Sequence, residues 1–428
     1  MALTDMHIVV RSLRHRLFST ITTISMVAVA VALLLTLLTL RESAARAFAR
    51  GTGNMHVLVA ADDSPLAAVL NSVFYARAPR RPLTMALYEK IAADQRLSWA
   101  IPVQHGDNLR GYPSIATTPE IFTKFQPVAG EPWRFAAGTG FSAGNDTSSA
   151  VWELVIGANV AKGTGLGVGS TVTLTHGTDQ RGMVHTDTPF TVIGVLKPTG
   201  SPHDRAVFMR LDATWIMHAR DTRKASGNAV EPTVENLTER ERLITGIFLR
   251  AKTREGAELS PAVGMVYDEL RRDVRLTVAR PSEEVGNLMR IVGNIDLIVL
   301  VIAWVVLFSS AISVMLVMYE SVEQRRRQIA ILRVLGAGPG RVALLVLTES
   351  AVIGLLGAAC GVLLLLVAGP VAAGIVQSKL GLVLSVAINP RDAAGVVLGT
   401  LALCMVAGLV PALMGYRTDV VRQLRPQG

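Results

Sequence analysis

The residues best suited to chemistry are histidines and acids that gather in one stretch of the chain. Four of the eight histidines fall between residues 176 and 218. His176 and His185 flank a predicted hairpin, and His203 directly precedes Asp204. Imidazole and carboxylate groups are zinc ligands, so His176, His185, His203 and Asp204 are the candidates for a zinc site. Their spacing matches no established ligand pattern, and histidines in ordinary surface networks are the alternative.

Other site chemistry has no support in the sequence. The glycines of Gly163–Gly169 lack the GxxxxGK[ST] ending of a phosphate loop and the GxGxxG spacing of a dinucleotide loop. No G-x-S-x-G elbow occurs, and no Ser-His-Asp set can be assigned. We therefore expect turn-forming glycines here, no catalytic residue and no cofactor bound by this chain other than zinc at the histidines.

A second group of charges lies in the segment from Tyr319 to Val342, YESVEQRRRQIAILRVLGAGPGRV, which has apolar sequence on both sides. Glu323 and Arg327 have the i,i+4 spacing of a helical ion pair, and the glycines from Gly336 onward end the helix. A short basic amphipathic helix binds either anionic lipid headgroups or a cytoplasmic protein partner. Both alternatives stay open on these residues alone.

The elements that position these charges are four apolar stretches. The chain is 50% hydrophobic and only 18% charged, whereas soluble domains average about 25% charged residues. About 20 apolar residues cross a bilayer. The first stretch is too long for the apolar core of a cleaved signal peptide. The predicted spans lie near residues 17–40, 291–319, 342–376 and 393–416.

Arginine placement predicts the orientation of these spans. Positive charge is enriched on the cytoplasmic side. Arginines cluster before span one (Arg11, Arg14 and Arg16), between spans two and three (Arg325, Arg326, Arg327, Arg333 and Arg341) and after span four (Arg417, Arg422 and Arg425). Both termini are therefore expected in the cytoplasm. The large segment outside is close to neutral, so the net charge of +9 indicates a lipid or cytoplasmic partner rather than nucleic acid.

The external segment predicts a mixed α+β domain without disulfides, because both cysteines, Cys360 and Cys404, fall inside spans. Residues 220–241 predict a polar surface loop. Strands are expected at 151–156, 171–175, 190–200, 246–252 and 275–279, and helices at 83–94, 158–162 and 261–272. The expected organisation is a cytoplasmic N-terminus with span one at 1–41, the external domain at 42–289, span two at 290–319, a cytoplasmic helix at 320–341, span three at 342–376, a short external loop at 377–392, span four at 393–416 and a cytoplasmic tail at 417–428.

The segment from Tyr319 to Leu364 resembles the transmembrane permeases of MacB/FtsX/LolC-type ABC transporters. The matching residues are Glu323, Arg325, Ile329, Arg333, Gly336, Glu349, Gly354, Gly357 and Gly361. The C-terminal sequence resembles the family's C-terminal motif. The matching residues are Pro411, Ala412, Arg417, Leu424 and Arg425, and Gly415 and Val420 depart from the motif. Residues 155–196 resemble the family's periplasmic domain, so the resemblance covers nearly the whole chain.

This resemblance implies an integral membrane fold of four transmembrane helices with a large α+β periplasmic domain inserted between helices 1 and 2. It implies a homodimer in the bacterial inner membrane that binds two copies of a cytoplasmic ABC ATPase, where ATP and magnesium belong to the ATPase. With about sixteen residues ahead of the first span, we expect the ATPase on a separate polypeptide. The residues expected to couple to it are Glu320, Glu323, Arg325, Arg326, Arg327, Ile329, Arg333 and Gly336, and those expected in helix packing are Glu349, Gly354, Gly357 and Gly361.

The function implied is mechanotransmission, in which ATP hydrolysis drives a periplasmic movement that exports or extracts an envelope substrate. The alternative is FtsX-like control of a periplasmic protein such as a cell-wall hydrolase. The external histidine-bearing segments are similar to a subgroup of stand-alone permeases linked to metal homeostasis. A periplasmic adaptor or substrate-binding partner and the substrate class stay open.

Overall fold

A computed structural model describes residues 2–79, 81–141, 150–177, 185–227, 230–254, 260–334, 336–380 and 388–416. The chain forms two compact units. The helical unit comprises residues 1–44, 292–379 and 384–428, and the α/β unit comprises residues 45–291 with 380–383.

The α/β unit is built on a mixed sheet whose strand order in the described residues is β13-β1-β12-β3-β4-β10-β6-β9-β5, with β7 beside β9 and β8 beside β3. Its strands are β1 (Val57–Ala60), β3 (Leu97–Leu109), β4 (Tyr112–Thr117), β5 (Phe135–Gly138), β6 (Glu153–Ile156), β7 (Thr171–Val172), β8 (Thr175–His176), β9 (Phe190–Leu196), β10 (Val207–Arg210), β12 (Gly246–Ala251) and β13 (Thr277–Ala279). A separate pair is β2 (Leu83–Thr84) with β11 (Leu243–Ile244).

Both faces of the central part of this sheet are buried, which explains strands such as β1 and β10 that are apolar at successive positions. Along β1, Val57 and Val59 belong to one core, and Leu58 and Ala60 belong to the other. The first core includes residues of α4 (Met85–Ala92), α6 (Ala158–Thr164), α7 (Leu211–Ala225) and α8 (Pro261–Arg271), and the second includes residues of α3 (Pro65–Ser72) and α5 (Glu120–Thr123). Three short 3-10 turns, η1 (Ala150–Trp152), η2 (Pro202–Arg205) and η3 (Val234–Asn236), complete this unit.

Two long helices connect to neighbouring strands of the sheet. α2 (Leu17–Gly51) leads into β1, and α9 (Pro281–Gln324) starts immediately after β13. β1 and β13 pair antiparallel, with Leu58 opposite Ala279 and Ala60 opposite Thr277. Each helix therefore has one end in the α/β unit and the remainder in the helical unit.

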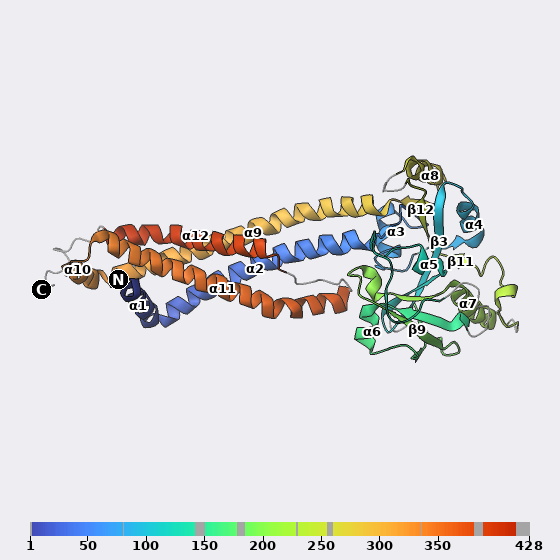
Figure 1. The fold of residues 1–428 in the computed structure, drawn as a ribbon, viewed down its shortest axis with the longest axis horizontal. Helices are drawn as coiled ribbons and strands as arrows, with labels where there is room; N and C mark the ends of the chain where they lie inside the picture. Colours follow the sequence, from blue (N-terminus) through green and yellow to red (C-terminus); the bar gives the residue numbers. More distant parts are fainter. Residues whose placement is uncertain are drawn as a thin grey trace. The chain divides into compact units, whose positions relative to one another are not determined.

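The helical unit contains α1 (Ala2–His15), most of α2 and α9, α10 (Arg326–Val334), α11 (Pro339–Leu380) and α12 (Pro390–Tyr416) (Figure 1). Among the described residues, four segments are long and apolar enough to cross a membrane: Leu17–Ser43, Leu300–Gln324, Pro339–Ala373 and Pro390–Tyr416. The order of spans and inserted α/β domain is the one predicted from sequence.

Glycines allow close contacts inside the helical unit. A Cβ on Gly361 would lie 2.7 Å from the Ala28 carbonyl oxygen of α2, and one on Gly357 would lie 2.6 Å from Val27. A Cβ on Gly354 would lie 2.9 Å from Cys404 of α12. Because a side chain has no room at these positions, the spacing of glycines sets how closely α11 approaches α2 and α12.

Two sequence expectations need correction. A single cytoplasmic helix at 320–341 does not form, because α9 continues to Gln324 and a separate α10 begins at Arg326. Glu320 and Glu323 therefore belong to the end of α9. The loop expected at 220–241 is helical through Ala225, because α7 packs buried residues such as Trp215 against the sheet and carries the helix onward. The tail at 417–428 lies outside the described residues.

Candidate functional site

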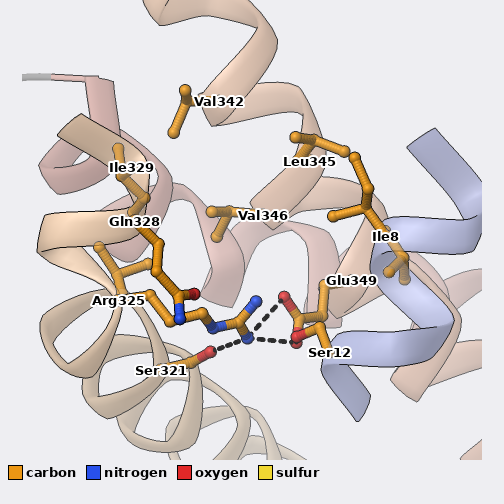
Figure 2. Close-up of a pocket in the computed structure, with 12 residues that line it drawn as sticks. Ile8, Ser12, Ser321, Arg325, Gln328, Ile329, Val342, Leu345, Val346 and Glu349 are labelled. Atoms are coloured by element: carbon orange, nitrogen blue, oxygen red, sulfur yellow. Dashed lines mark hydrogen bonds and ion pairs between the residues drawn. The ribbon is translucent and has the colours of Figure 1, made fainter. Parts of the chain in front are cut away.

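Two of the predicted coupling residues, Arg325 and Ile329, and the predicted packing residue Glu349 line a small cavity of about 100 Å³ within the helical unit. α1 contributes Ser12, the end of α9 contributes Ser321, and α11 contributes Glu349 (Figure 2). Arg325 lies at the break between α9 and α10. The remaining lining residues are Ile8, Val9, Val322, Gln328, Ile329, Val342, Leu345 and Val346.

A buried carboxylate organises this cavity. The Arg325 guanidinium approaches both Glu349 oxygens, at 3.1 and 3.4 Å, and also donates to Ser321 Oγ. Ser12 Oγ donates to Glu349 Oε1 at 2.6 Å. The Glu349 side chain is only 8% exposed, whereas Arg325 is 26% exposed. One acid on α11 therefore joins α1 to the α9–α10 break, as Figure 2 shows.

A second arginine stands beside this network. Arg16 donates to Gln324 Oε1 and to the Glu320 carbonyl at the end of α9. Burial lowers the pKa of Arg16 from its ordinary value and Arg325 lowers it further, whereas Glu349 raises it. The carboxylate of Glu349 thus offsets part of the repulsion between two guanidinium groups.

The outer face of α10 combines basic and apolar side chains. Ile329 is buried against α11, whereas Arg327 is exposed and Ile331 and Val334 are 45% and 63% exposed. Arg326 forms an i,i+3 ion pair with Glu323 at 2.6 Å. Gly336 follows with φ +95°, a left-handed conformation that favours glycine.

The contribution of α1 to this cavity was not predicted from the sequence. Ser12 was not a candidate, and Arg16 was used only to predict the orientation of the spans, because a lone serine and a basic flank next to a span have ordinary structural roles. The one signal was the spacing of Val9 and Leu13, which places two buried side chains on one helical face.

The predicted zinc candidates separate into two places in the α/β unit. His203 is buried, with Nε2 3.1 Å from the Gly51 carbonyl and Nδ1 in contact with Tyr75 Oη. The Asp204 carboxylate accepts from the Thr199 and Gly200 backbone N–H groups at 2.8 and 2.9 Å. These two residues are engaged in structure. His176 and His185 instead lie together with Asp107 and His218.

The buried imidazoles predict an acid-sensitive α/β unit. Burial lowers the pKa of His203 and of His105 to about 4, so unfolded chains bind protons between pH 6.5 and 4 that the folded unit does not. The free energy of unfolding should therefore decrease as the pH is lowered from 6.5 to 4, by up to about 3 kcal/mol for each of the two histidines. Tryptophan-monitored unfolding of the chain at several pH values measures this fall.

A His203→Gln variant is the control for this pH effect. Glutamine keeps a donor and an acceptor but does not titrate, so the variant should show a smaller loss of stability toward pH 4. Comparing the two chains also removes the opposing contribution of His176, whose pKa is raised by its hydrogen bond with Asp107. Equal pH slopes for both chains would contradict the assignment to His203.

Comparison with known proteins places these features in a family. The family model described as the MacB-like periplasmic core domain matches residues 20–262, which is more than half of the chain, and the FtsX-like permease C-terminal model matches residues 300–420. The chain belongs to the MacB/FtsX family of ABC transporter permeases. The MacB/FtsX-type fold, with its inserted α/β domain and apolar helices, is thus confirmed.

One curated relative of this MacB/FtsX permease is distant in sequence. An uncharacterised ABC transporter permease from Methanocaldococcus jannaschii is 22% identical over 242 residues, which are 56% of this chain and 55% of the relative. The match thus spans about half the length of that curated relative.

Two solved structures are similar to the permease at low TM-score. The periplasmic region of MacB from Actinobacillus actinomycetemcomitans matches with a TM-score of 0.34 and 10% identity, covering 56% of this chain and 94% of that region. The extracellular domain of the noncanonic ABC-type transporter YknZ from Gram-positive bacteria matches with a TM-score of 0.28 and 11% identity, covering 52% and 98%.

Proposed function

We propose that this permease couples ATP hydrolysis by a separate cytoplasmic ATPase to movement of its MacB-like domain, which acts on an envelope substrate by export or extraction. Two copies of the chain would pair and carry two ATPase subunits. In this scheme both termini and α10 face the cytoplasm of a bacterial inner membrane, and this chain contributes no catalytic residue. Its membership of an ABC permease family supports an ATPase partner.

The observation that carries the proposal is the buried ion pair at the α9–α10 break. Arg325 holds Glu349 of α11, and Glu349 holds Ser12 of α1. A force on α10 therefore reaches α1, α9 and α11 through one connected set of short contacts. Such a set resists deformation, because separating Arg325 from Glu349 would leave a buried charge without a partner.

The lengths of α2 and α9 support transmission over a distance. At about 1.5 Å per residue, the 35 residues of α2 and 44 residues of α9 extend about 52 and 66 Å. A bilayer core is about 30 Å thick, so both helices are longer than a crossing requires. Uninterrupted helices are stiff along their axes, and their far ends are built into the core of the α/β unit through Phe48 and Val285.

The docking surface that we assign to the ATPase is the exposed face of α10. We expect an Arg327→Glu, Ile331→Ser double variant to bind its ATPase at least ten-fold more weakly, because it reverses a charge and removes apolar area at the contact. Tagged chain would be purified from the membranes of cells that produce it naturally. Mass spectrometry then identifies the co-purified ATPase by its phosphate-loop peptide.

The matched control for this experiment is Arg14→Glu, which reverses an exposed arginine on α1 instead of α10. It should retain the ATPase. Equal ATPase recovery from the α10 variant and the control would contradict docking through α10. Failure to recover any ATPase with the unaltered chain, under conditions that preserve its fold, would contradict the proposed coupling.

A further inference from the structure

Four side chains of metal-ligating types converge within the α/β unit. The ligand atoms of Asp107, His176, His185 and His218 all lie within 4.8 Å of one another. Asp107 Oδ1 is 3.1 Å from His176 Nδ1, 3.3 Å from His218 Nε2 and 3.5 Å from His185 Nε2. Two atoms bound to one tetrahedral zinc at about 2.0–2.1 Å lie about 3.4 Å apart, which matches these separations.

Different parts of the fold deliver the four residues. Asp107 of β3 stands directly opposite His176 of β8 in an antiparallel pair. His218 lies on α7, and the His185 backbone is fixed by its N–H bond to the Leu174 carbonyl at 2.9 Å. Sheet pairing and helix packing thus preorganise the set.

His185 indicates that the cluster needs a cation. Its side chain is 3% exposed, and its Nδ1 is 2.9 Å from Asp221 Oδ2. Because a carboxylate accepts, the proton of a neutral ring sits on Nδ1 and leaves a lone pair on Nε2. That buried Nε2 has no hydrogen-bond partner within the described part of the chain and faces Asp107. A lone pair facing a carboxylate oxygen is repulsive unless a metal ion or a second ring proton lies between them.

The surroundings match those of metal sites in proteins. A carboxylate commonly holds the second nitrogen of a metal-ligating histidine, which fixes its tautomer, and Asp221 has this place at His185. Asp221 and His218 lie three residues apart on α7, so one helix face supplies both a ligand and this supporting acid. The Asp107 side chain is buried, and its carboxylate oxygens lie against ring nitrogens of all three histidines.

We infer that Asp107, His176, His185 and His218 bind a zinc ion that ties β3, β8 and the His185 segment to α7. Three imidazoles and a carboxylate favour zinc-class transition metals over calcium or magnesium, which prefer oxygen ligands. Four protein ligands fill a tetrahedral shell, and closed shells are typical of structural sites. Access for the ion comes from a surface cavity of about 350 Å³ lined by His185 and Asp221. This inference does not depend on coupling to an ATPase.

The test is zinc titration of the purified full chain in detergent, after removal of bound metal and with a histidine-free affinity tag. We expect one zinc ion per chain by elemental analysis and a higher unfolding temperature with zinc. Cobalt should give the intense visible absorption of a tetrahedral site. Asp107→Asn and His218→Gln should each weaken zinc binding by more than about 100-fold, whereas Asp221→Asn, which removes a positioning residue, should weaken it about 10- to 100-fold with the cobalt spectrum retained.

Matched controls separate this site from general histidine binding. His56→Gln removes another histidine of the same unit, and Asp187→Asn removes an exposed acid two residues from His185; both should bind zinc normally. If a buried variant fails to fold, His176→Gln serves, because that side chain is 57% exposed. A folded chain that binds no zinc at micromolar concentration, or zinc binding that survives His176→Gln, would overturn the inference and indicate a cluster held by protonated imidazoles.

Discussion

Glu349→Ala is expected to destabilise the helical unit by about 3 kcal/mol and to abolish the proposed coupling to an ATPase. Removing one partner of a buried ion pair costs about 3–5 kcal/mol, because the other charge is left unpaired. Arg325 is 26% exposed, so water can solvate part of its charge. We therefore expect a loss of stability at the lower end of this range, about 3 kcal/mol. Denaturant unfolding in mixed micelles, followed by helical circular dichroism, measures the stability. ATPase activity of the assembled complex measures the coupling.

The chain contains its own control for this substitution. Glu323 and Arg326 form an exposed pair at the end of α9 with side-chain exposures of 45% and 37%, and such pairs contribute less than about 1 kcal/mol. Glu323→Ala should therefore have little effect on stability. Adding Arg325→Met to Glu349→Ala should recover much of the loss, because an apolar pair leaves no buried charge. Equal costs for Glu349→Ala and Glu323→Ala would contradict a structural joint at Glu349.

Gly361→Leu is expected to destabilise the helical unit by more than about 3 kcal/mol. Its Cβ would lie 2.7 Å from a backbone carbonyl oxygen of α2 and from Val31 Cβ. Backbone atoms inside a packed helix pair cannot move aside as a flexible side chain can, so α11 would have to separate from α2. The same unfolding measurement reports the loss, and reactivity of the buried Cys404 thiol toward a maleimide reports loosened packing.

Gly395→Leu is the matched comparison for Gly361→Leu. Gly395 lies on apolar helix α12, and a Cβ there meets nothing within 4 Å among the described residues. Leucine is also a better helix former than glycine by up to about 1 kcal/mol, so this variant should keep or gain stability. A similar loss at both positions would show that added bulk, rather than the α2–α11 contact, is responsible.

Sequence patterns were sufficient for the order of the elements. Long apolar runs and clustered arginines indicate spans in any context, and strands such as residues 246–252 carry local β-branched and turn signals. The boundary after span two was predicted at residue 319, where the charged residues begin, whereas α9 continues to Gln324. Residues 220–225 were assigned to a loop because their polarity outweighs their helical spacing in a local window.

For the candidate sites too, the local sequence does not show which distant residues meet in the fold. His176 and His185 could be paired from their spacing around a hairpin, whereas Asp107 and His218 lie 69 and 42 residues from His176. Only the register of β3 against β8 and the docking of α7 bring them together, and neither is encoded locally. His203 and Asp204 looked equivalent to the other candidates in sequence. In the structure, His203 hydrogen-bonds to the Gly51 carbonyl at the end of α2, and Asp204 accepts from backbone N–H groups of the turn at Thr199 and Gly200.

The pairing of β1 with β13 has a mechanical consequence. Because α2 runs into one of these strands and α9 out of the other, a displacement of one helix past the other would shear this edge ladder and break its interstrand hydrogen bonds. A common displacement of both helices strains no hydrogen bond in the sheet. The attachment therefore resists sliding between the two helices, whereas a displacement shared by both helices would leave the sheet of the α/β unit intact.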